Sequence, residues 1–223
     1  SGQLEWNYPK AESAFSEYVS DPARPVPYTE DVHFLRTREY MTDDQRFAER
    51  RPDVLTFKTG ILTEDVIVTG VVTADLYTSL STTDADFVVK LIDVFPDDLS
   101  YNKVDIYADK DPVRVYPMGG YEMLIHGEVF RGRYRKSFEN PEPFIPGKIE
   151  RVKFDIGDVA HSFKKGHRIM VQIQSTWFPL VDRNPQKFVN IYEAKESDFQ
   201  KAAIRIYHVA KNESNILLPV LKK

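Results

Sequence analysis

The sequence contains no cysteine, which excludes disulfide bonds, thiolate metal ligands and a cysteine nucleophile. It also lacks an apolar run of about 18 residues, the length that a membrane-spanning helix needs. We therefore expect no membrane span. The net charge of −4 leaves no basic surplus for a phosphate backbone, so we expect no nucleic acid as a partner. No targeting segment is recognisable, and the compartment stays open between bacterial periplasm and cytoplasm.

Catalytic motifs are missing as well. None of the ten glycines brackets a serine as Gly-x-Ser-x-Gly, the pattern that exposes a serine nucleophile on a sharp strand-to-helix turn. The Gly119-Gly120 pair is a turn signal, too short to form a phosphate-binding loop. We therefore predict that the chain carries no catalytic residue, needs no cofactor and is inactive by itself.

Histidines and carboxylates give no convincing metal site. The five histidines never pair at the i, i+4 spacing of a helical zinc site. His161 and His167 flank a turn, and we favour strand-end positions over metal binding for both. His126 precedes Gly127, which indicates a packed histidine beside a β-bulge. Asp93 shares a strand face with apolar residues, so it needs a partner, and we expect an arginine.

The residues that are present favour an all-β fold. Apolar residues make up 42% of the chain, enough for a substantial core. From residue 51 onward apolar and polar residues alternate with period two, as in Val152, Phe154 and Ile156. Turn signals separate eight to ten such runs, which predicts a β-sandwich or barrel. The candidate strands include 65–72, 73–80, 87–92, 121–130, 152–156, 168–174, 203–209 and 216–221.

Residues 1–50 differ, because they hold four prolines and few regular patterns. Residues 11–19 read as a short helix, and residues 21–28 as an extended run, since each proline biases its predecessor away from helix. We predict an irregular N-terminal arm over 1–50 that lies on another surface, and a sandwich over 51–223. One further short helix is expected over 193–200.

Two polar and aromatic groups stand out. Arg131, Arg133 and Arg135 alternate, and we favour ion pairs that join strands or domains over a site for an anionic ligand. Residues 175–185 place Trp177 and Phe178 together in a proline-stiffened loop, which either plugs the core of the domain or contacts a second domain. We expect this loop to expose an apolar patch.

A family resemblance rests on the motifs 166–172 (GHRIMVQ), 175–179 (STWFP) and 182–185 (DRNP), supported by 51–55 (RPDVL), 68–70 (VTG), 83–87 (TDADF), 90–96 (KLIDVFP) and 131–135 (RGRYR). In this order, they resemble the C-terminal domain of the X-Pro dipeptidyl-peptidase, cocaine esterase and α-amino-acid ester hydrolase (glutaryl acylase) family of serine hydrolases. The similarity covers roughly residues 20–221.

The resemblance implies a jelly-roll β-sandwich, like galactose-binding domains, that packs on an α/β-hydrolase domain of the same polypeptide. The catalytic triad of the family lies in that other domain, and the chain is expected to begin just after the catalytic histidine. The resemblance also places Leu76 and Tyr77 at a pair that lines the acyl pocket, with Tyr where the family has Phe. In a regular strand this pair faces opposite ways, so at least one member belongs to the core.

Interdomain or loop contacts are expected from Trp177, Phe178, Asp182 and Arg183. Two alternatives stay open. The first is a carbohydrate-binding module that presents Trp177, Phe178 and Tyr121, and the second is an assembly module, with a homo-oligomer as the partner. The substrate of the parent enzyme is not readable from these residues.

Overall fold

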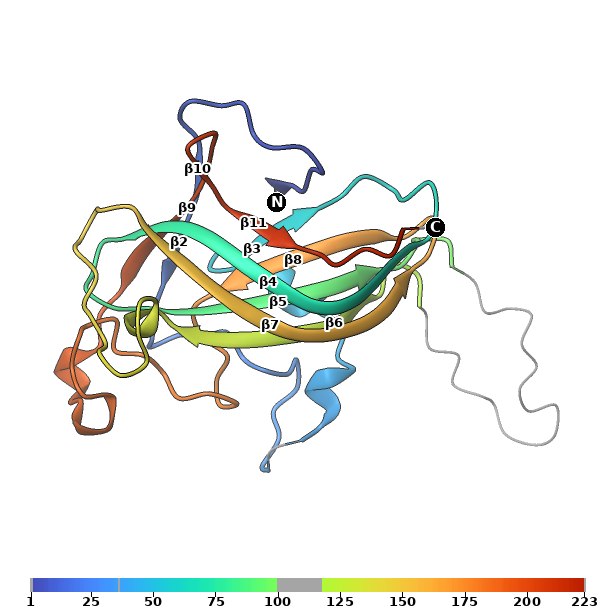
Figure 1. Ribbon diagram of the computed structural model, residues 1–223. Helices are drawn as coiled ribbons and strands as arrows, with labels where there is room; N and C mark the ends of the chain where they lie inside the picture. Colours follow the sequence, from blue (N-terminus) through green and yellow to red (C-terminus); the bar gives the residue numbers. More distant parts are fainter. Residues whose placement is uncertain (1, 36, 100–117, 223) are drawn as a thin grey trace.

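The computed structural model describes residues 2–35, 37–99 and 118–222, which form two facing β-sheets (Figure 1). The first sheet has the strand order β1-β3-β8-β5-β6. It contains β1 (Gly2–Gln3), β3 (Leu55–Lys58), β5 (Asp86–Val94), β6 (Glu122–Arg131) and β8 (Arg168–Gln174). The second contains β2 (Phe15–Ser20), β4 (Val66–Leu80), β7 (Glu150–Phe163), β9 (Ala202–Val209), β10 (Asn212–Glu213) and β11 (Asn215–Leu217).

The connection of these strands is that of a jelly roll. The main strands of the second sheet run β2-β9-β4-β7, while β3-β8-β5-β6 face them in the first. Counted in chain order from β2 to β9, the two sheets therefore read 1-8-3-6 and 2-7-4-5, the eight-strand double Greek key that defines a jelly roll. The all-β sandwich predicted from the alternation is thus confirmed.

Helical structure is confined to one turn or so at a time. There is a single α-helical turn, α1 (Arg46–Glu49), among the described residues. The 3₁₀ turns are η1 (Glu39–Met41), η2 (Gly132–Tyr134), η3 (Ile191–Glu193) and η4 (Glu196–Asp198). No helix in the described part of the chain is long and apolar enough to cross a membrane. The helix expected over 193–200 is replaced by η3 and η4.

The helix expected over residues 11–19 is wrong. Residues 15–20 form β2, which pairs antiparallel with β9 from Phe15 opposite Tyr207 to Ser20 opposite Ala202. Local sequence signals favoured a capped helix, but pairing with β9, nearly two hundred residues away, overrides them. The first sandwich strand therefore lies within the segment expected to be an arm.

Within the N-terminal segment, the chain that follows β2 forms a third layer over the first sheet. Strand β5 is buried on both faces, because Phe87, Val89 and Leu91 point into the core between the sheets while Val88 and Ile92 point outward. Tyr28 covers the outward row at Val88. The Gln45 carbonyl accepts a hydrogen bond from Gln172 Nε2 at 3.2 Å. The segment thus lies on the domain's own sheet.

Two β-bulges meet where the sheets face each other. Strand β4 is continuous, but its pairing with β7 shifts between Val72 and Thr73, the boundary between the two strands expected there. On β6, the pairing with β5 shifts beside His126, as predicted. Gly157 of β7 has a φ of +133°, and a Cβ added there would lie 2.5 Å from His126 Nε2. The histidine therefore fills the space that the missing side chain leaves.

Candidate functional site

Leu76 and Tyr77 lie on opposite faces of β4. Leu76 is 1% exposed and belongs to the core between the sheets. Tyr77 is half-buried on the outer face, opposite Arg151 of β7. The Arg151 guanidinium lies 5.8 Å from the Tyr77 ring centroid and donates two hydrogen bonds to Asp75, at 2.7 and 2.5 Å. Only Tyr77 of this pair is placed to meet a second domain.

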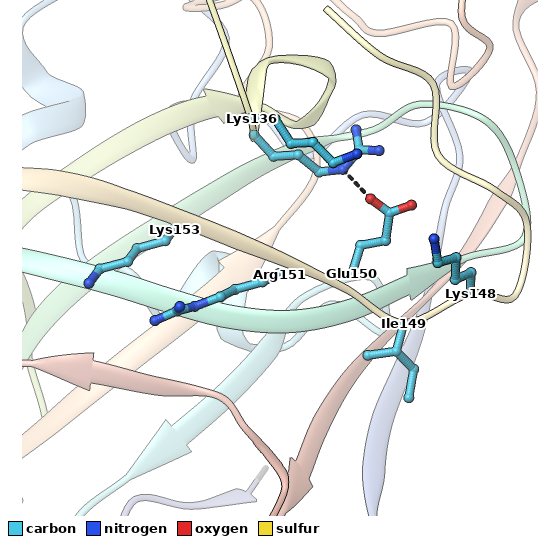
Figure 2. Close-up of a pocket in the computed structure, with 7 residues that line it drawn as sticks. Lys136, Lys148, Ile149, Glu150, Arg151 and Lys153 are labelled. Atoms are coloured by element: carbon cyan, nitrogen blue, oxygen red, sulfur yellow. Dashed lines mark hydrogen bonds and ion pairs between the residues drawn. The ribbon is translucent and has the colours of Figure 1, made fainter.

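A shallow basic pocket of about 440 Å³ lies beside Arg151, at the start of β7 (Figure 2). Its cations are Arg135, Lys136, Lys148, Arg151 and Lys153. Arg135 donates to Glu150 Oε2 at 2.6 Å, and Lys136 lies 2.5 Å from Glu142. Together with the pair of Arg151 and Asp75, three of the five cations are neutralised locally, which argues against a site for an anionic ligand.

Trp177 is a plug for the domain's own surface rather than an exposed ring. It is 5% exposed and packs with Tyr28 and Val88. The edge of Tyr40 also meets it, at 5.8 Å between centroids. The expectation of an exposed apolar patch around Trp177 is therefore wrong, because the N-terminal segment covers this ring. Phe178 is partly exposed.

The neighbouring segments hold this loop in place. Tyr28 N–H donates to the Phe178 carbonyl at 2.9 Å, and Phe178 N–H donates to the Val26 carbonyl at 3.0 Å. Asp182 accepts a hydrogen bond from Arg131 Nη2 at 2.8 Å. Arg183 donates to the Pro22 carbonyl at 2.9 Å, with its guanidinium over the Phe199 ring. All four residues expected in interdomain or loop contacts thus have partners within this chain.

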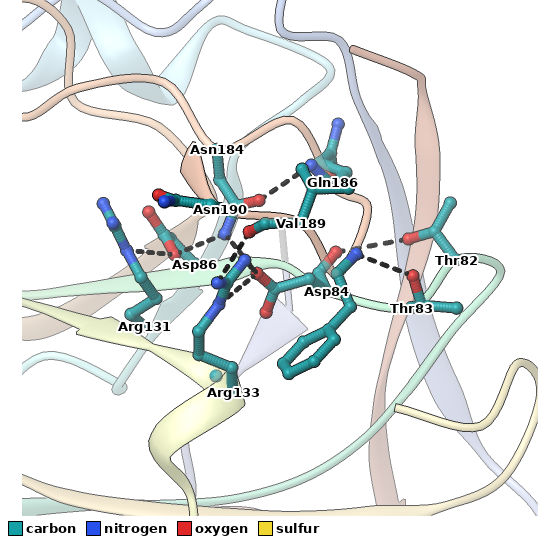
Figure 3. A network of polar contacts seen from close by, with 12 residues as sticks. Thr82, Thr83, Asp84, Asp86, Arg131, Arg133, Asn184, Gln186, Val189 and Asn190 are labelled. Atoms are coloured by element: carbon teal, nitrogen blue, oxygen red, sulfur yellow. Dashed lines mark hydrogen bonds and ion pairs between the residues drawn. The ribbon is translucent and has the colours of Figure 1, made fainter. Parts of the chain in front are cut away.

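A buried polar network joins the end of this loop to β5 (Figure 3). Asp84 is fully buried and accepts hydrogen bonds from Arg133 Nε at 2.8 Å and Nη2 at 2.5 Å. Asn184 Nδ2 lies between two carboxylates, 3.1 Å from Asp84 and 2.7 Å from Asp86. Arg131 Nε approaches Asp86 at 3.3 Å. The network therefore fixes the loop to the first sheet.

The arginines were expected to share one strand face, which is not what the structure has. The strand ends at Arg131, and η2 turns the chain, so each guanidinium reaches a different carboxylate. The favoured interpretation as structural ion pairs is confirmed. Burial raises the pKa of Asp86 to about 7, opposed by Arg131 and Asn184. Burial also raises the pKa of Asp84, opposed mainly by Arg133.

Asp93 is paired, but not with an arginine. Its two carboxylate oxygens lie 2.8 Å from His161 Nε2 and 2.8 Å from His167 Nδ1. Strand β7 and the turn that precedes β8 bring the two histidines to the end of β5, a proximity that spacing along the chain does not reveal. The described residues contain no cluster of histidines and carboxylates suited to a metal ion.

The sequence reading missed two features. Lys90 is fully buried in the outward row of β5, where Nζ donates to Gln45 Oε1 at 2.9 Å and lies 5.0 Å from the Trp177 ring centroid. Burial lowers its pKa to about 7. Its place in a strand of apolar residues was the available signal. The second is an apolar ridge in the N-terminal segment, formed by Val32, Phe34 and Leu35, which are 101%, 108% and 83% exposed.

Comparisons with known proteins agree with this architecture. Residues 2–217 match the family described as the X-Pro dipeptidyl-peptidase C-terminal non-catalytic domain. The chain is 34% identical over 222 residues to cocaine esterase from Rhodococcus sp. (strain MB1 Bresler). The matched region covers 100% of this chain and 35% of the esterase.

Two solved structures are similar along nearly the whole chain. An aminopeptidase from a marine sediment Thaumarchaeota archaeon is 40% identical with a TM-score of 0.89. An α-amino acid ester hydrolase is 44% identical with a TM-score of 0.88. Each match covers 99% of this chain and 35% of the other. The chain therefore spans about a third of the length of these relatives.

Proposed function

Because the chain belongs to the family of X-Pro dipeptidyl-peptidase C-terminal non-catalytic domains, we propose that it packs on an α/β-hydrolase domain of the same polypeptide and supports its catalysis. The relatives are an esterase, an ester hydrolase and an aminopeptidase, so the parent reaction is the acylation of a serine by an ester or amide, followed by hydrolysis. The present chain supplies none of the reacting groups.

The apolar ridge of Val32, Phe34 and Leu35 carries this proposal. These three apolar side chains lie close together and are almost fully exposed, which is unusual for a soluble domain that has no partner. Burial of each contributes about 1.5–3 kcal/mol, so the ridge supplies roughly 5–9 kcal/mol to a contact that covers it.

The base of the ridge is held by hydrogen bonds. Glu30 N–H donates to Asp43 Oδ2 at 3.1 Å, and Thr37 N–H donates to the Tyr28 hydroxyl at 3.1 Å. The Tyr28 ring is itself packed beside Trp177. Anchoring on both sides lowers the entropy that a partner must remove when it binds the ridge.

Hydrogen exchange tests the proposed contact. Amides of residues 32–35 should exchange fast in the 223-residue chain and at least tenfold more slowly in the full-length hydrolase. Equal exchange in the two proteins would remove the ridge from the interface.

Substitutions give a second readout. In the full-length protein, Phe34→Ser with Leu35→Ser should lower the unfolding midpoint, while the same pair leaves the midpoint of the isolated chain unchanged. Tyr192→Ser, at another exposed aromatic residue, is the matched control and should change neither. Turnover of a p-nitrophenyl ester by the isolated chain should equal that of buffer.

We further infer that Tyr77, not Leu76, is the member of the pair that contributes to the acyl pocket of the parent enzyme. Support comes from its outward position and from Arg151, whose contact with Asp75 fixes the cation beside the phenol. Tyr77→Phe in the full-length enzyme should change the relative kcat/KM for polar and apolar acyl groups by severalfold. Tyr207→Phe, on the neighbouring strand β9, is the control and should leave that ratio unchanged.

The carbohydrate-binding alternative is less favoured, because Trp177 offers no open face for a sugar ring to stack on. The assembly alternative differs from the main proposal in one outcome. If a second copy of this chain covers the ridge, the isolated chain will form dimers that Phe34→Ser with Leu35→Ser abolishes.

A further inference from the structure

A cavity of about 690 Å³ lies inside the sandwich, near the β1 end of the first sheet. Leu76 and Ile206 of the second sheet form one wall, and Val171 and Ile173 of the first sheet form the opposite wall. Residues 2–10 cover it from the side. Its volume falls within the range of about 300–1,000 Å³ that is typical of small-molecule sites.

One end of this apolar cavity is polar. The inward row of β9 runs Ala202, Ile204, Ile206 and then His208, so strand alternation directs the imidazole into the space between the sheets. His208 Nε2 lies 2.9 Å from Ser16 Oγ, which also lines the cavity. The Phe57 ring meets the imidazole edge-on, at 5.3 Å between centroids.

The second ring nitrogen of His208, Nδ1, has no hydrogen-bond partner among the described residues. Burial lowers the pKa of His208, so the ring is neutral at pH 7 and one nitrogen is an acceptor. Glu213 also lines the cavity and is paired in register with His208 across β9 and β10, while the other ionisable residues of the lining are Glu5, Tyr8 and Lys10.

We propose that this cavity is a binding site for a small molecule with a flat apolar body and a single hydrogen-bond donor. The apolar walls cover the body of the molecule. In the tautomer of the proposal, Nε2 of His208 donates to Ser16 Oγ, and Nδ1 accepts the hydrogen bond of the bound molecule. The family model describes this domain only as non-catalytic, and the site does not depend on contact with a hydrolase domain.

Indole and indene are matched probes, because they share shape and differ in the N–H donor. Calorimetry with the 223-residue chain should show saturable binding of both, with a negative heat-capacity change from apolar burial. Indole should bind about three- to tenfold more tightly, which is the effect of one neutral hydrogen bond.

Three variants decide the location. His208→Phe keeps an aromatic ring against Phe57 and should abolish the preference for indole over indene. Tyr207→Phe, the outward neighbour on β9, should preserve it. Ile173→Trp fills the cavity and should abolish binding of both probes.

The proposal fails if neither probe saturates, or if indole keeps its advantage in His208→Phe. It also fails if a folded Ile173→Trp chain binds both probes as tightly as the original sequence. If Ile173→Trp does not fold, the comparison of His208→Phe with Tyr207→Phe still gives a decisive result.

Discussion

The substitution Arg133→Met removes the cation that neutralises Asp84 in the core of the polar network. Asp84 is fully buried, and its Oδ1 atom already has no hydrogen-bond partner among the described residues. Without Arg133, the carboxylate keeps the 3.1 Å contact with Asn184 and a weak interaction with the backbone of Ala85, both of them neutral groups. Breaking a buried pair in this way costs about 3–5 kcal/mol, since a buried charge is left uncompensated.

The cost should depend on pH, with a sign that the structure fixes. Burial raises the pKa of Asp84, and loss of Arg133 raises it further, so the folded variant relieves the charge by binding a proton. Protonating Asp84 costs about 1.36 kcal/mol more for each unit by which the pH is raised, so over the three units from pH 5 to pH 8 the cost rises by up to about 4 kcal/mol. The variant should therefore be much closer to the original chain at pH 5 than at pH 8.

Urea unfolding at the two pH values measures this effect. At pH 8 the midpoint of thermal unfolding should also fall, by roughly 6–20 °C for a domain of this size. Arg205→Met removes the cation of an exposed pair with Glu17 and should leave the midpoint nearly unchanged. The double variant Arg133→Met with Asp84→Asn should recover most of the loss. A penalty equal at pH 5 and pH 8 would refute the reasoning.

Three further predictions concern single residues. Gly157→Ala should cost about 2–4 kcal/mol, because the added Cβ meets His126 at a positive φ, and adding His126→Ala should restore part of the loss in urea unfolding. Asp86 has a raised pKa of about 7, so the folded chain keeps a proton that the unfolded chain loses near pH 4. The free energy of unfolding should therefore fall by a few kcal/mol as the pH rises from about 4 to 7, and Asp86→Asn should flatten that slope. Lys90 has a lowered pKa of about 7, so stability should rise as pH increases from about 7 to 10, and Lys90→Met should abolish that rise without destabilising the chain at pH 6.

Strand alternation predicted most of the sandwich, because period two is a local property of the chain. The runs around Phe87, Val152 and Ile169 all became strands with the expected inward face. Alternation does not show which strands pair with each other, so the prediction of a jelly roll rested on the family resemblance alone.

The errors share a different cause, which is dependence on distant partners. Residues 11–19 have local helix signals, and only β9 makes them a strand. Asp93 was recognised as needing a partner, but its two histidines come from β7 and from the turn before β8, about seventy residues further along. Trp177 was recognised as a core plug or a contact residue, and the N-terminal segment that decides between them lies some 140 residues earlier.

For the candidate pocket pair, the sequence predicted the opposed faces of Leu76 and Tyr77 but not which one points inward. That choice depends on the register of β4 against β7, where Tyr77 lies opposite Arg151 and Leu76 lies opposite the buried Val152. The cavity near His208 could not be predicted from the sequence for the same reason, since its lining comes from seven segments spread over the whole chain.

The pairing of β2 with β9 also bears on the order in which the chain acquires its structure. Ser16 and His208, hydrogen-bonded to each other, are 192 positions apart, and β3 likewise waits for β8. Contacts of such long sequence separation slow folding, because the entropy of closing a large loop is lost before the strand pairing can stabilise the chain. During synthesis, β2 stays unpaired until β9 (Ala202–Val209) has left the ribosome, while β3 has only the two-residue strand β1 beside it until β8 follows. A chain truncated before residue 202 would lack β9 and leave the edge of β2 open to other chains, so we expect such fragments to aggregate rather than fold partially.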